Sequence, residues 1–393
     1  MEILFYFSLF LFLHTYLIYP ITTILAARLK KKSTLATLET KPWVSVVISV
    51  FNEERWIQQK IESVFQSNYP MEKVDVYIGS DHSNDSTNDI IHKLTSKFHQ
   101  LYFFEYNTRR GKSYVINDLM VEVFKKRSKS KDHIILFTDA NVILDPDTME
   151  QLTKHFTNEQ IGLVDSKVLP KNLRVDGISK SENQYLNLEI SLKHAEGKLW
   201  GTMMGAFGAC YAVRSDLVER VPEKFIVDDF YISMRVLQKN YYAVSELAAF
   251  CHEAIPNEIK EEFKRKSRIS SGNFQNLGFF YPVLFSRPLI LAYCFFSHKV
   301  LRWVSPFLLI MLLFCSILLA CLHQKLFQYF SIALLVFLVG LPFLDLLFSK
   351  MNMHIYILRS VRYFVRMNIA LLNGFYNYFK GIKQGSWEPP KRM

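Results

Sequence analysis

The chain has 393 residues, 50% of them hydrophobic and 15% aromatic, which suits one large domain with extra segments or two domains. Lys and Arg number 47 against 36 Asp and Glu, and a net charge of +11 is typical of proteins that meet nucleic acid, anionic lipid or phosphorylated substrates. The apolar residues gather at both ends with basic residues beside them, which disfavours nucleic acid and favours a membrane protein. The five cysteines show no metal-binding spacing, so neither a zinc site nor a disulfide framework is expected.

The N-terminal segment is predicted to cross a membrane. Residues 3–27 carry no full charge and exceed the length of about 20 apolar residues that a bilayer requires. No basic region precedes this segment and its apolar run is too long for a signal peptide. The run RLKKK at 28–32 places the following chain in the cytoplasm by the positive-inside bias. We therefore expect a transmembrane helix over 1–29.

Residues 42–255 have the alternating pattern of a soluble α/β domain. The runs typical of strands are WVSVVISVF, VDVYIGSD, LYFFEYN and HIILFTDAN, and helical patterns separate them. Such a βαβ series predicts a parallel sheet with right-handed crossovers. Ligands of open sheets of this kind bind beyond the C-terminal ends of the strands.

Each of these predicted strands is followed by a polar cluster. The clusters are Asn52-Glu53-Glu54, the run 81–85, the run 109–112 and Asp139-Ala140-Asn141. Any one alone is more simply a helix cap or a solvated turn, but four at one sheet edge indicate a shared ligand. Acids suit the N–H and hydroxyl groups of a nucleoside, and Lys112 after Gly111 suits phosphate. Asp139 and Asn141 would supply oxygens to a divalent cation, so the pattern predicts a nucleotide-diphosphate ligand.

The order and spacing of these motifs resemble the family 2 inverting glycosyltransferases, which include cellulose, chitin, hyaluronan and poly-N-acetylglucosamine synthases. The matching stretches are VSVVISVFNEERWI, YIGSDHSNDST, RRGKSYVIN, FTDAN, GAFGACYAVRSDL and VDDFYISMRVLQKNY. They cover residues 43–242, with apolar segments on both sides as in membrane-bound members. The resemblance implies an α/β GT-A fold, a UDP-sugar donor and Mg²⁺ or Mn²⁺.

Matched residue by residue, the resemblance also implies site roles. The residues implied to bind the donor are Asn52, Glu53, Asp81, Arg110, Lys112, Asp139, Arg265 and Arg268. Those implied to bind the acceptor are Gly205, Ala206, Gly208, Cys210 and Asp228. Asp139 and Asn141 stand where the family has its metal motif, and Asp229 stands at the catalytic base.

The chemistry of an inverting transfer supports one base and one cation site. A carboxylate must take the proton of the acceptor hydroxyl, a contribution typically worth ~10²–10⁴-fold in rate. The leaving group is a nucleoside diphosphate, so a metal ion and Lys112 would stabilise its charge in place of a general acid. The simpler alternative for Asp228 and Asp229 is a pair of acids at a helix start.

Two departures from the family pattern bear on the product. The metal motif ends in neutral Asn141, so a cation would be held more loosely or chiefly by the diphosphate. Processive members carry Q-x-x-R-W after the base, whereas this chain has EEFKRKSRISSGN, which keeps Arg265 and Arg268 without the Gln or Trp. This puts long-chain synthesis in doubt. The alternative role of the basic run is contact with anionic headgroups.

Beyond the α/β domain, residues 256–303 are expected to form basic, interfacial helices, and 304–349 two membrane spans at 304–322 and 329–348. Residues 355–393 are expected to form an amphipathic helix and a tail, because Arg359, Arg362 and Arg366 fall on one helical face.

These expectations combine in a membrane-bound glycosyltransferase, located in a bacterial inner membrane with its catalytic domain in the cytoplasm. It would transfer a sugar, with inversion, to a polysaccharide or lipid-linked acceptor in exopolysaccharide or cell-envelope synthesis. The expected partners are the donor, the acceptor and the bilayer but no nucleic acid, and a homo-oligomer or synthase complex stays open. The alternatives are a processive β-linked polysaccharide synthase and a non-catalytic nucleotide-binding scaffold.

Overall fold

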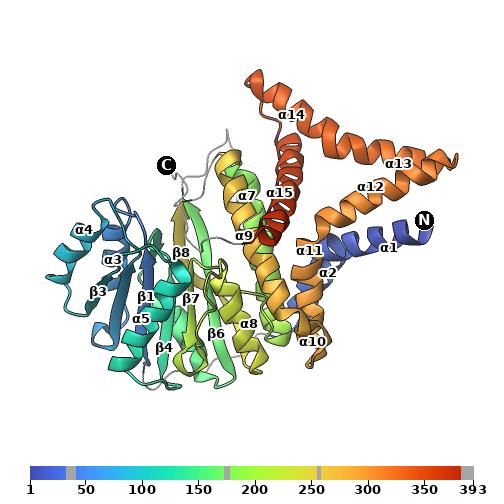
Figure 1. The fold of residues 1–393 in the computed structure, drawn as a ribbon. Coiled ribbons are helices and arrows are strands. Elements are labelled where there is room, and N and C mark those ends of the chain that lie inside the picture. Colours follow the sequence, from blue (N-terminus) through green and yellow to red (C-terminus); the bar gives the residue numbers. More distant parts are fainter. Residues whose placement is uncertain (32–40, 172–177, 255–257, 382–393) are drawn as a thin grey trace. The chain divides into compact units, whose positions relative to one another are not determined.

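The computed structural model describes residues 1–31, 41–171, 178–254 and 258–381, and the chain divides into two compact units (Figure 1). The sheet unit comprises Ala26–Asn172 and Glu189–Ile255, and the helical unit comprises Met1–Leu25, Leu173–Leu188 and Pro256–Gly381. The predicted C-terminal tail beyond residue 381 lies outside the described residues.

The sheet unit is built on one eight-stranded sheet with the strand order β3-β2-β1-β4-β7-β6-β8-β5. Its strands are β1 (Trp43–Val50), β2 (Val74–Ser80), β3 (Leu101–Glu105), β4 (His133–Thr138), β5 (Val142–Leu144), β6 (Ile161–Lys171), β7 (Cys210–Arg214) and β8 (Tyr242–Ala254). Its helices are α3 (Ile57–Phe65), α4 (Thr87–Thr95), α5 (Lys112–Lys126), α6 (Thr148–Thr153) and α8 (Asp228–Gln238), with 3₁₀ turns η2 (Met71–Lys73), η3 (Lys154–Thr157) and η4 (Ser215–Leu217).

The first four strands are parallel, as the βαβ pattern predicts. Val46 of β1 lies opposite Val76 of β2 on one side and Leu136 of β4 on the other. Strands covered on both faces read as continuous apolar runs rich in β-branched residues, and β1 is such a run. The polar clusters that follow these strands therefore lie at the same edge of the sheet.

The second half of the sheet corrects the prediction of a parallel sheet. Strand β7 is antiparallel to both β4 and β6, and β5 is antiparallel to β8, whereas β6 and β8 are parallel to each other. Antiparallel β7 follows a long helix, so no βαβ crossover fixes its direction, and its apolar composition does not reveal it. The sheet is therefore mixed.

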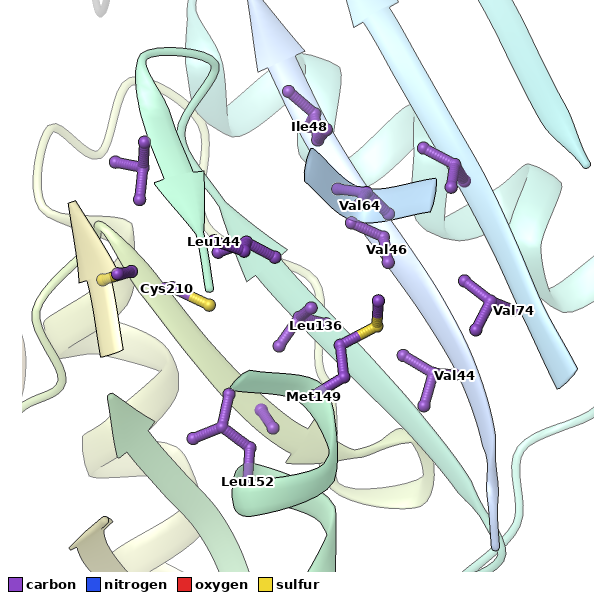
Figure 2. Packing of buried hydrophobic residues seen from close by; sticks show 14 of the residues in the cluster. Val44, Val46, Ile48, Val64, Val74, Leu136, Leu144, Met149, Leu152 and Cys210 are labelled. Atoms are coloured by element: carbon purple, nitrogen blue, oxygen red, sulfur yellow. The ribbon is translucent and has the colours of Figure 1, made fainter. Parts of the chain in front are cut away.

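The main apolar core of the sheet unit lies against one face of the sheet (Figure 2). Val46 and Leu136 from the strands meet Ile57, Ile61 and Val64 from α3, all 1% exposed or less. The spacing of these α3 residues, at i, i+4 and i+7, gives the helix an apolar stripe. Packing of this stripe fixes the loop between β1 and α3, which carries the first polar cluster.

The helical unit is formed by segments from both ends of the chain. Its helices are α1 (Glu2–Leu13), η1 (His14–Ile18), α2 (Tyr19–Leu29), α9 (Ile259–Phe280), η5 (Tyr281–Phe285), α10 (Leu289–Cys294), η6 (Phe295–Val300), α11 (Leu301–Trp303), α12 (Ser305–Cys321), α13 (Lys325–Leu335), η7 (Val336–Gly340), α14 (Leu341–Lys350) and α15 (Tyr356–Phe379). Helix α2 belongs to this unit up to Leu25 and to the sheet unit from Ala26. Helix α7 (Ser179–Trp200) belongs to this unit up to Leu188 and to the sheet unit from Glu189.

Two helical stretches of the described chain are long and apolar enough to cross a membrane, Glu2–Leu29 and Lys325–Lys350. The predicted span at 304–322 corresponds to α12, whose 17 residues meet the same test only together with Leu289–Trp303, across a 64° bend. By length and composition the described residues thus offer two spans, or three if the bent pair counts as one.

The basic face of α15 is partly used inside the helical unit. Arg362 lies 2.8 Å from Asp345 of α14, and the side chain of Asp345 is fully buried. Ser270 and Ser271 of α9 donate hydrogen bonds to backbone carbonyls of α15, including that of Gly374 at 3.1 Å. A Cβ on Gly374 would come within 2.3 Å of Ser270, so the small residue permits this close helix packing.

Candidate active site

Hydrogen bonds join the loops after β1 and β2. The backbone N–H of Asn52 donates to Ser83, and the Asn52 side chain accepts from the N–H of Asn84 at 2.9 Å. The N–H of Glu53 donates to Thr87 at 2.9 Å. Asn52 has a φ of 51°, a left-handed conformation that Asn adopts more readily than most residues. The first two predicted clusters therefore form one fixed surface, with the Glu53 side chain buried.

Asp81 connects the second cluster to the third. One of its carboxylate oxygens accepts the backbone N–H of Arg110 and the other that of Gly111, both at 2.8 Å. Gly111 has a φ of 100° and immediately precedes α5, so it supplies a turn that other residues would strain. The Arg110 guanidinium bonds Asp118 and lies over the ring of Tyr106. The Asp81 carboxylate thus fixes the loop that presents Lys112.

Lys112 connects the third cluster to the fourth and to the start of α8. Its ammonium group lies 2.8 Å from Oδ1 of Asp139 and 3.5 Å from Oδ1 of Asp228. Burial lowers the pKa of Lys112, but the two carboxylates outweigh this effect and its pKa lies above the usual value. Lys112 is therefore a permanent cation between two acids.

Asp228 and Asp229 begin α8, where the helix dipole favours negative charge. Within the described residues, Oδ2 of Asp228 is buried without a hydrogen-bond partner. Asp229 accepts the backbone N–H of Phe230 at 2.7 Å. Burial and then the neighbouring charge of Asp228 raise the pKa of Asp229 to about 7, although Lys112 opposes the shift. A carboxylate of this pKa can accept a proton near neutral pH.

The segment implied to bind the acceptor lies against these acids. Gly208 packs so closely on Asp229 that a Cβ would lie 2.9 Å from Oδ2 of the acid. Gly205 has a φ of +79°, and a Cβ there would lie 2.5 Å from the ring of Phe230. The neighbouring Ala206 is buried. These small residues let the backbone approach the predicted base closely.

Three of the predicted site residues lie in the apolar core or on a helix of the helical unit. The side chain of Cys210 packs in the apolar core (Figure 2). Arg265 bonds Glu262 and Glu182 within the helical unit, at 2.9 and 3.0 Å. Arg268 also lies on α9 of that unit. Their roles in donor or acceptor binding stay predictions.

The predicted metal ligands differ in their surroundings. The Asp139 side chain is 34% exposed and faces Lys112, so it can reach a ligand. Asn141 is buried, and its amide donates to Glu253 of β8 at 3.3 Å. Across the described residues, no three His, Cys, Asp or Glu side chains form a metal-binding group. Asp139 fits a cation, but most of the coordination would have to come from donor phosphates.

Buried charged residues around the site escaped the sequence analysis. Lys60 of α3 is completely buried and donates to the hydroxyl of Thr138, which precedes Asp139. Burial lowers its pKa to about 8. Asp165 of β6 and Lys193 of α7 form a buried ion pair. The sequence signal that could have identified them is a charged residue on an otherwise apolar face, such as Lys60 one residue before Ile61.

With this geometry in place, comparison with known families defines the class of the protein. The family described as "Glycosyl transferase family 2" matches residues 45–221, and "Glycosyl transferase family group 2" matches residues 134–349. The second match covers more than half of the chain, and the chain belongs to this glycosyltransferase family. This confirms the glycosyltransferase family 2 domain and the transferase class, while the predicted relation to cellulose, hyaluronan and poly-N-acetylglucosamine synthases stays a prediction.

Curated relatives extend the comparison. The probable glycosyltransferase YdaM of Bacillus subtilis (strain 168) is 24% identical over 249 residues, covering 59% of this chain and 55% of that protein. A dolichyl N-acetyl-alpha-D-glucosaminyl phosphate 3-beta-D-2,3-diacetamido-2,3-dideoxy-beta-D-glucuronosyltransferase of Methanococcus voltae is 32% identical over 78 residues, 19% of this chain and 24% of that protein. The chain thus spans about half the length of the first relative and a quarter of the second.

A solved structure supports the fold. The mannosyltransferase PcManGT from Pyrobaculum calidifontis, in complex with GDP-Man and Mn²⁺, matches with a TM-score of 0.67 and 19% identity over 96% of this chain and 99% of that chain. This likeness confirms the predicted GT-A-like nucleotide-sugar transferase fold. No comparison tests the roles of individual site residues.

Proposed function

We propose that this protein transfers a sugar from a nucleoside-diphosphate sugar, with inversion, to a hydroxyl of a lipid-linked or polysaccharide acceptor. The observation that carries the proposal is the contact of Lys112 with both Asp139 and Asp228, next in the chain to Asp229. A fixed cation suits the diphosphate, and a carboxylate of raised pKa suits the acceptor. The two halves of an inverting transfer thus have groups of the right chemistry.

In the proposed reaction, the acceptor oxygen bonds to the anomeric carbon as that carbon's bond to the diphosphate oxygen breaks. The hydroxyl proton passes to Asp229, and the nucleoside diphosphate leaves with the bonding electrons. One oxygen of Asp228 lacks a hydrogen-bond partner in the described chain. It can accept a hydrogen bond from a second hydroxyl of the sugar acceptor. A pKa of about 7 leaves about half of Asp229 ionised at neutral pH.

Lys112 and Asp139 would act on the leaving group. The ammonium of Lys112 carries a charge that balances developing negative charge on the diphosphate. A divalent cation bound with the donor and held by Asp139, with Asn141 as the second predicted ligand, would add to this stabilisation. The Mn²⁺ complex of PcManGT supports this cofactor, and its GDP-Man complex widens the expected donors from UDP-sugars to GDP-sugars.

We propose an acceptor carried by a lipid, at a membrane. Two apolar helical stretches, Glu2–Leu29 and Lys325–Lys350, are long enough to span a bilayer. The name of the M. voltae relative places its acceptor sugar on dolichyl phosphate. The basic run 28–32 would keep the sheet unit on the cytoplasmic side. These three features favour an envelope or exopolysaccharide pathway with a lipid-linked intermediate.

The test is nucleotide release from a panel of UDP- and GDP-sugars, measured on membranes containing the protein with and without Mn²⁺. Asp229→Asn is the informative variant, because it removes the base while preserving the shape and most hydrogen bonds of the side chain. We expect transfer to disappear and nucleotide affinity to remain. Unchanged turnover in this variant would refute the assignment of the base, and loss of both functions with the fold intact would favour a different role.

The non-catalytic scaffold is the second candidate, and the weak metal motif favours it, because neutral Asn141 is buried and bonded to Glu253. It predicts nucleotide binding with no sugar transfer for any donor. The processive synthase predicts long products, whereas single additions would exclude it. The ion pairing of Arg265 with Glu182 and Glu262 favours single addition, because this arginine of the basic run is already engaged.

A further inference from the structure

The ion pair of Asp165 and Lys193 is almost completely enclosed in the sheet unit. The two side chains are 1% and 2% exposed, and Nζ of Lys193 lies 3.3 Å from Oδ2 of Asp165. Removing two charges from water costs several kcal/mol per ion, so a buried pair is weak evidence for stability. Two apolar side chains of similar size would fill the same space at lower cost. The pair therefore calls for a role other than packing.

Both members of the pair hold the same residue, Phe207. The backbone N–H of Phe207 donates to the Asp165 carboxylate, at 3.1 Å from each oxygen. The ammonium of Lys193 lies 3.4 Å from the centre of the Phe207 ring. A cation this close to an aromatic face is attracted by the ring quadrupole, strongly where water is excluded. Phe207 is thus fixed at its main chain and at its side chain.

Two further buried side chains hold the preceding residues. Glu196 of α7 accepts the N–H of Met204 at 3.0 Å, and Ser233 of α8 accepts the N–H of Ala206 at 2.9 Å. The segment forms no strand or helix, so these side chains take the place of a backbone ladder. Three different elements, β6, α7 and α8, therefore determine its path.

This segment leads directly to the predicted base. Gly208 follows Phe207 and is the residue whose added Cβ would lie 2.9 Å from Oδ2 of Asp229. At such a distance a small displacement of the Phe207 backbone alters the space beside the carboxylate. Reaction rates fall steeply when reacting groups are misplaced. The rate of transfer should therefore depend on how firmly Phe207 and Gly208 are held.

We propose that Asp165 and Lys193 are positioning residues of the transfer reaction, holding Phe207 and Gly208 so that an acceptor hydroxyl meets Asp229 in the reactive orientation. The inference rests on the proposed function of Asp229 as the base. Asp165 supplies the hydrogen-bond acceptor, which is the essential contact, and Lys193 balances the charge of that buried carboxylate, while its contact with the Phe207 ring contributes less. The ligand class concerned is the hydroxylated acceptor, not the nucleotide donor.

The test separates the hydrogen bond from the charge with two double variants. In D165N/K193M both charges are gone, but the amide oxygen introduced at position 165 can still accept the Phe207 N–H. In D165L/K193M the acceptor is also gone, while size and apolar packing are preserved. We expect D165N/K193M to keep acceptor kcat/KM within about 5-fold of the wild type, and D165L/K193M to lose about 10- to 100-fold, the range expected for misplaced reacting groups. Donor KM and donor hydrolysis without acceptor should change by less than about 2-fold in either variant.

A matched control is the pair of Asp75 and Lys126, which lies near the opposite ends of the strands with its ions 2.7 Å apart. D75N/K126M should lower the unfolding temperature without a selective change in acceptor kcat/KM. Amide hydrogen exchange gives a readout besides activity: the peptide containing Phe207 should exchange faster in D165L/K193M and not in D165N/K193M.

The melting temperature and the nucleotide affinity show whether the two double variants are folded. If both are folded and their acceptor kcat/KM values are equal, the proposal is overturned. If D165L/K193M does not fold, K193M serves instead. It leaves Asp165 unpaired and should lose acceptor kcat/KM, and the added D165N should restore it, so absence of this rescue would also overturn the proposal. Failure of the proposed function looks different, because the wild type would then show no transfer or Asp229→Asn would retain it.

Discussion

The ammonium group of Lys112 lies 2.8 Å from the carboxylate of Asp139, so a residue after the third strand is paired with one after the fourth. The ion pair lies at the edge where the parallel strands end, the place where open α/β sheets bind their ligands. One cation there faces Asp139, Asp228 and, through a longer-range attraction, Asp229. Because three acids surround one lysine, these side chains can accept further positive charge. The metal ion that would bind with the anionic donor would supply it.

Replacing Lys112 should weaken the donor half of the site. In Lys112→Met the diphosphate loses its balancing charge, and Asp139 and Asp228 lose their cation. We expect kcat/KM for the donor to fall about 100-fold, the order of effect seen when one transition-state donor is removed. Lys112→Arg, which keeps the charge, should retain more activity. Steady-state kinetics with varied donor measure both, and equal losses in the two variants would argue against a role for charge.

The rate of transfer should depend on pH through Asp229. Because its pKa is raised to about 7, kcat/KM should fall tenfold per pH unit well below pH 7, where the base is protonated. Asp228→Asn removes the neighbouring negative charge that contributes to this shift, so the acid limb should move to lower pH. A pH–rate profile of the two proteins checks the direction, and a limb that moves to higher pH would contradict it.

Asp229 should also reduce the stability of the folded chain above neutral pH. When the pKa of a carboxyl is higher in the folded than in the unfolded chain, its protonated form stabilises the fold at acid pH. This stability is lost as the pH rises through the pKa of the folded chain. For Asp229 the loss falls between the ordinary pKa of 3.8 and about 7. Asp229→Asn should therefore melt about 2–4 °C higher than the wild type at pH 8 and show little gain at pH 4. Thermal unfolding at the two pH values provides the comparison.

Two glycines of the segment proposed to bind the acceptor should respond differently to alanine. Gly208→Ala places a methyl group 2.9 Å from Oδ2 of Asp229, so activity should fall while the melting temperature changes little. Gly205→Ala adds strain at a φ of +79° and a 2.5 Å approach to the Phe230 ring, so it should destabilise the protein by about 1–3 kcal/mol. Parallel measurement of melting and turnover distinguishes the two. Equal destabilisation would contradict the assignment of Gly208 to the site.

Mn²⁺ should bind weakly until the donor is present. Of the two predicted ligands, Asp139 is accessible but Asn141 is buried and bonded to Glu253, so phosphate oxygens would have to complete the coordination. Titration calorimetry should therefore show a large gain in Mn²⁺ affinity on addition of UDP or GDP. Asp139→Asn should reduce that gain. Tight Mn²⁺ binding to the free protein would contradict this arrangement.

The sequence predicted the donor edge better than the supports behind it. The four polar clusters could be located because each follows an apolar β-branched run, and βαβ order brings the ends of such strands together. Asp165, Lys193 and Lys60 could not be assigned, because a charged residue within an apolar pattern reveals its partner only when the distant segments pack. The directions of β7 and β5 were missed for a related reason, since strand composition does not encode whether a neighbour runs parallel or antiparallel.

The loops after β1 and β2 are bonded to each other through Asn52, Ser83 and Asn84, and in the proposed function this bonding would have a consequence for donor choice. A nucleotide that docks on an already ordered surface does not have to pay for freezing two loops, so its affinity reflects the direct contacts it makes. Swapping one base for another by engineering would then require exchanging individual side chains on this surface. Lengthening or replacing either loop would break the hydrogen bonds between the two loops. Binding of every nucleotide would then be weakened.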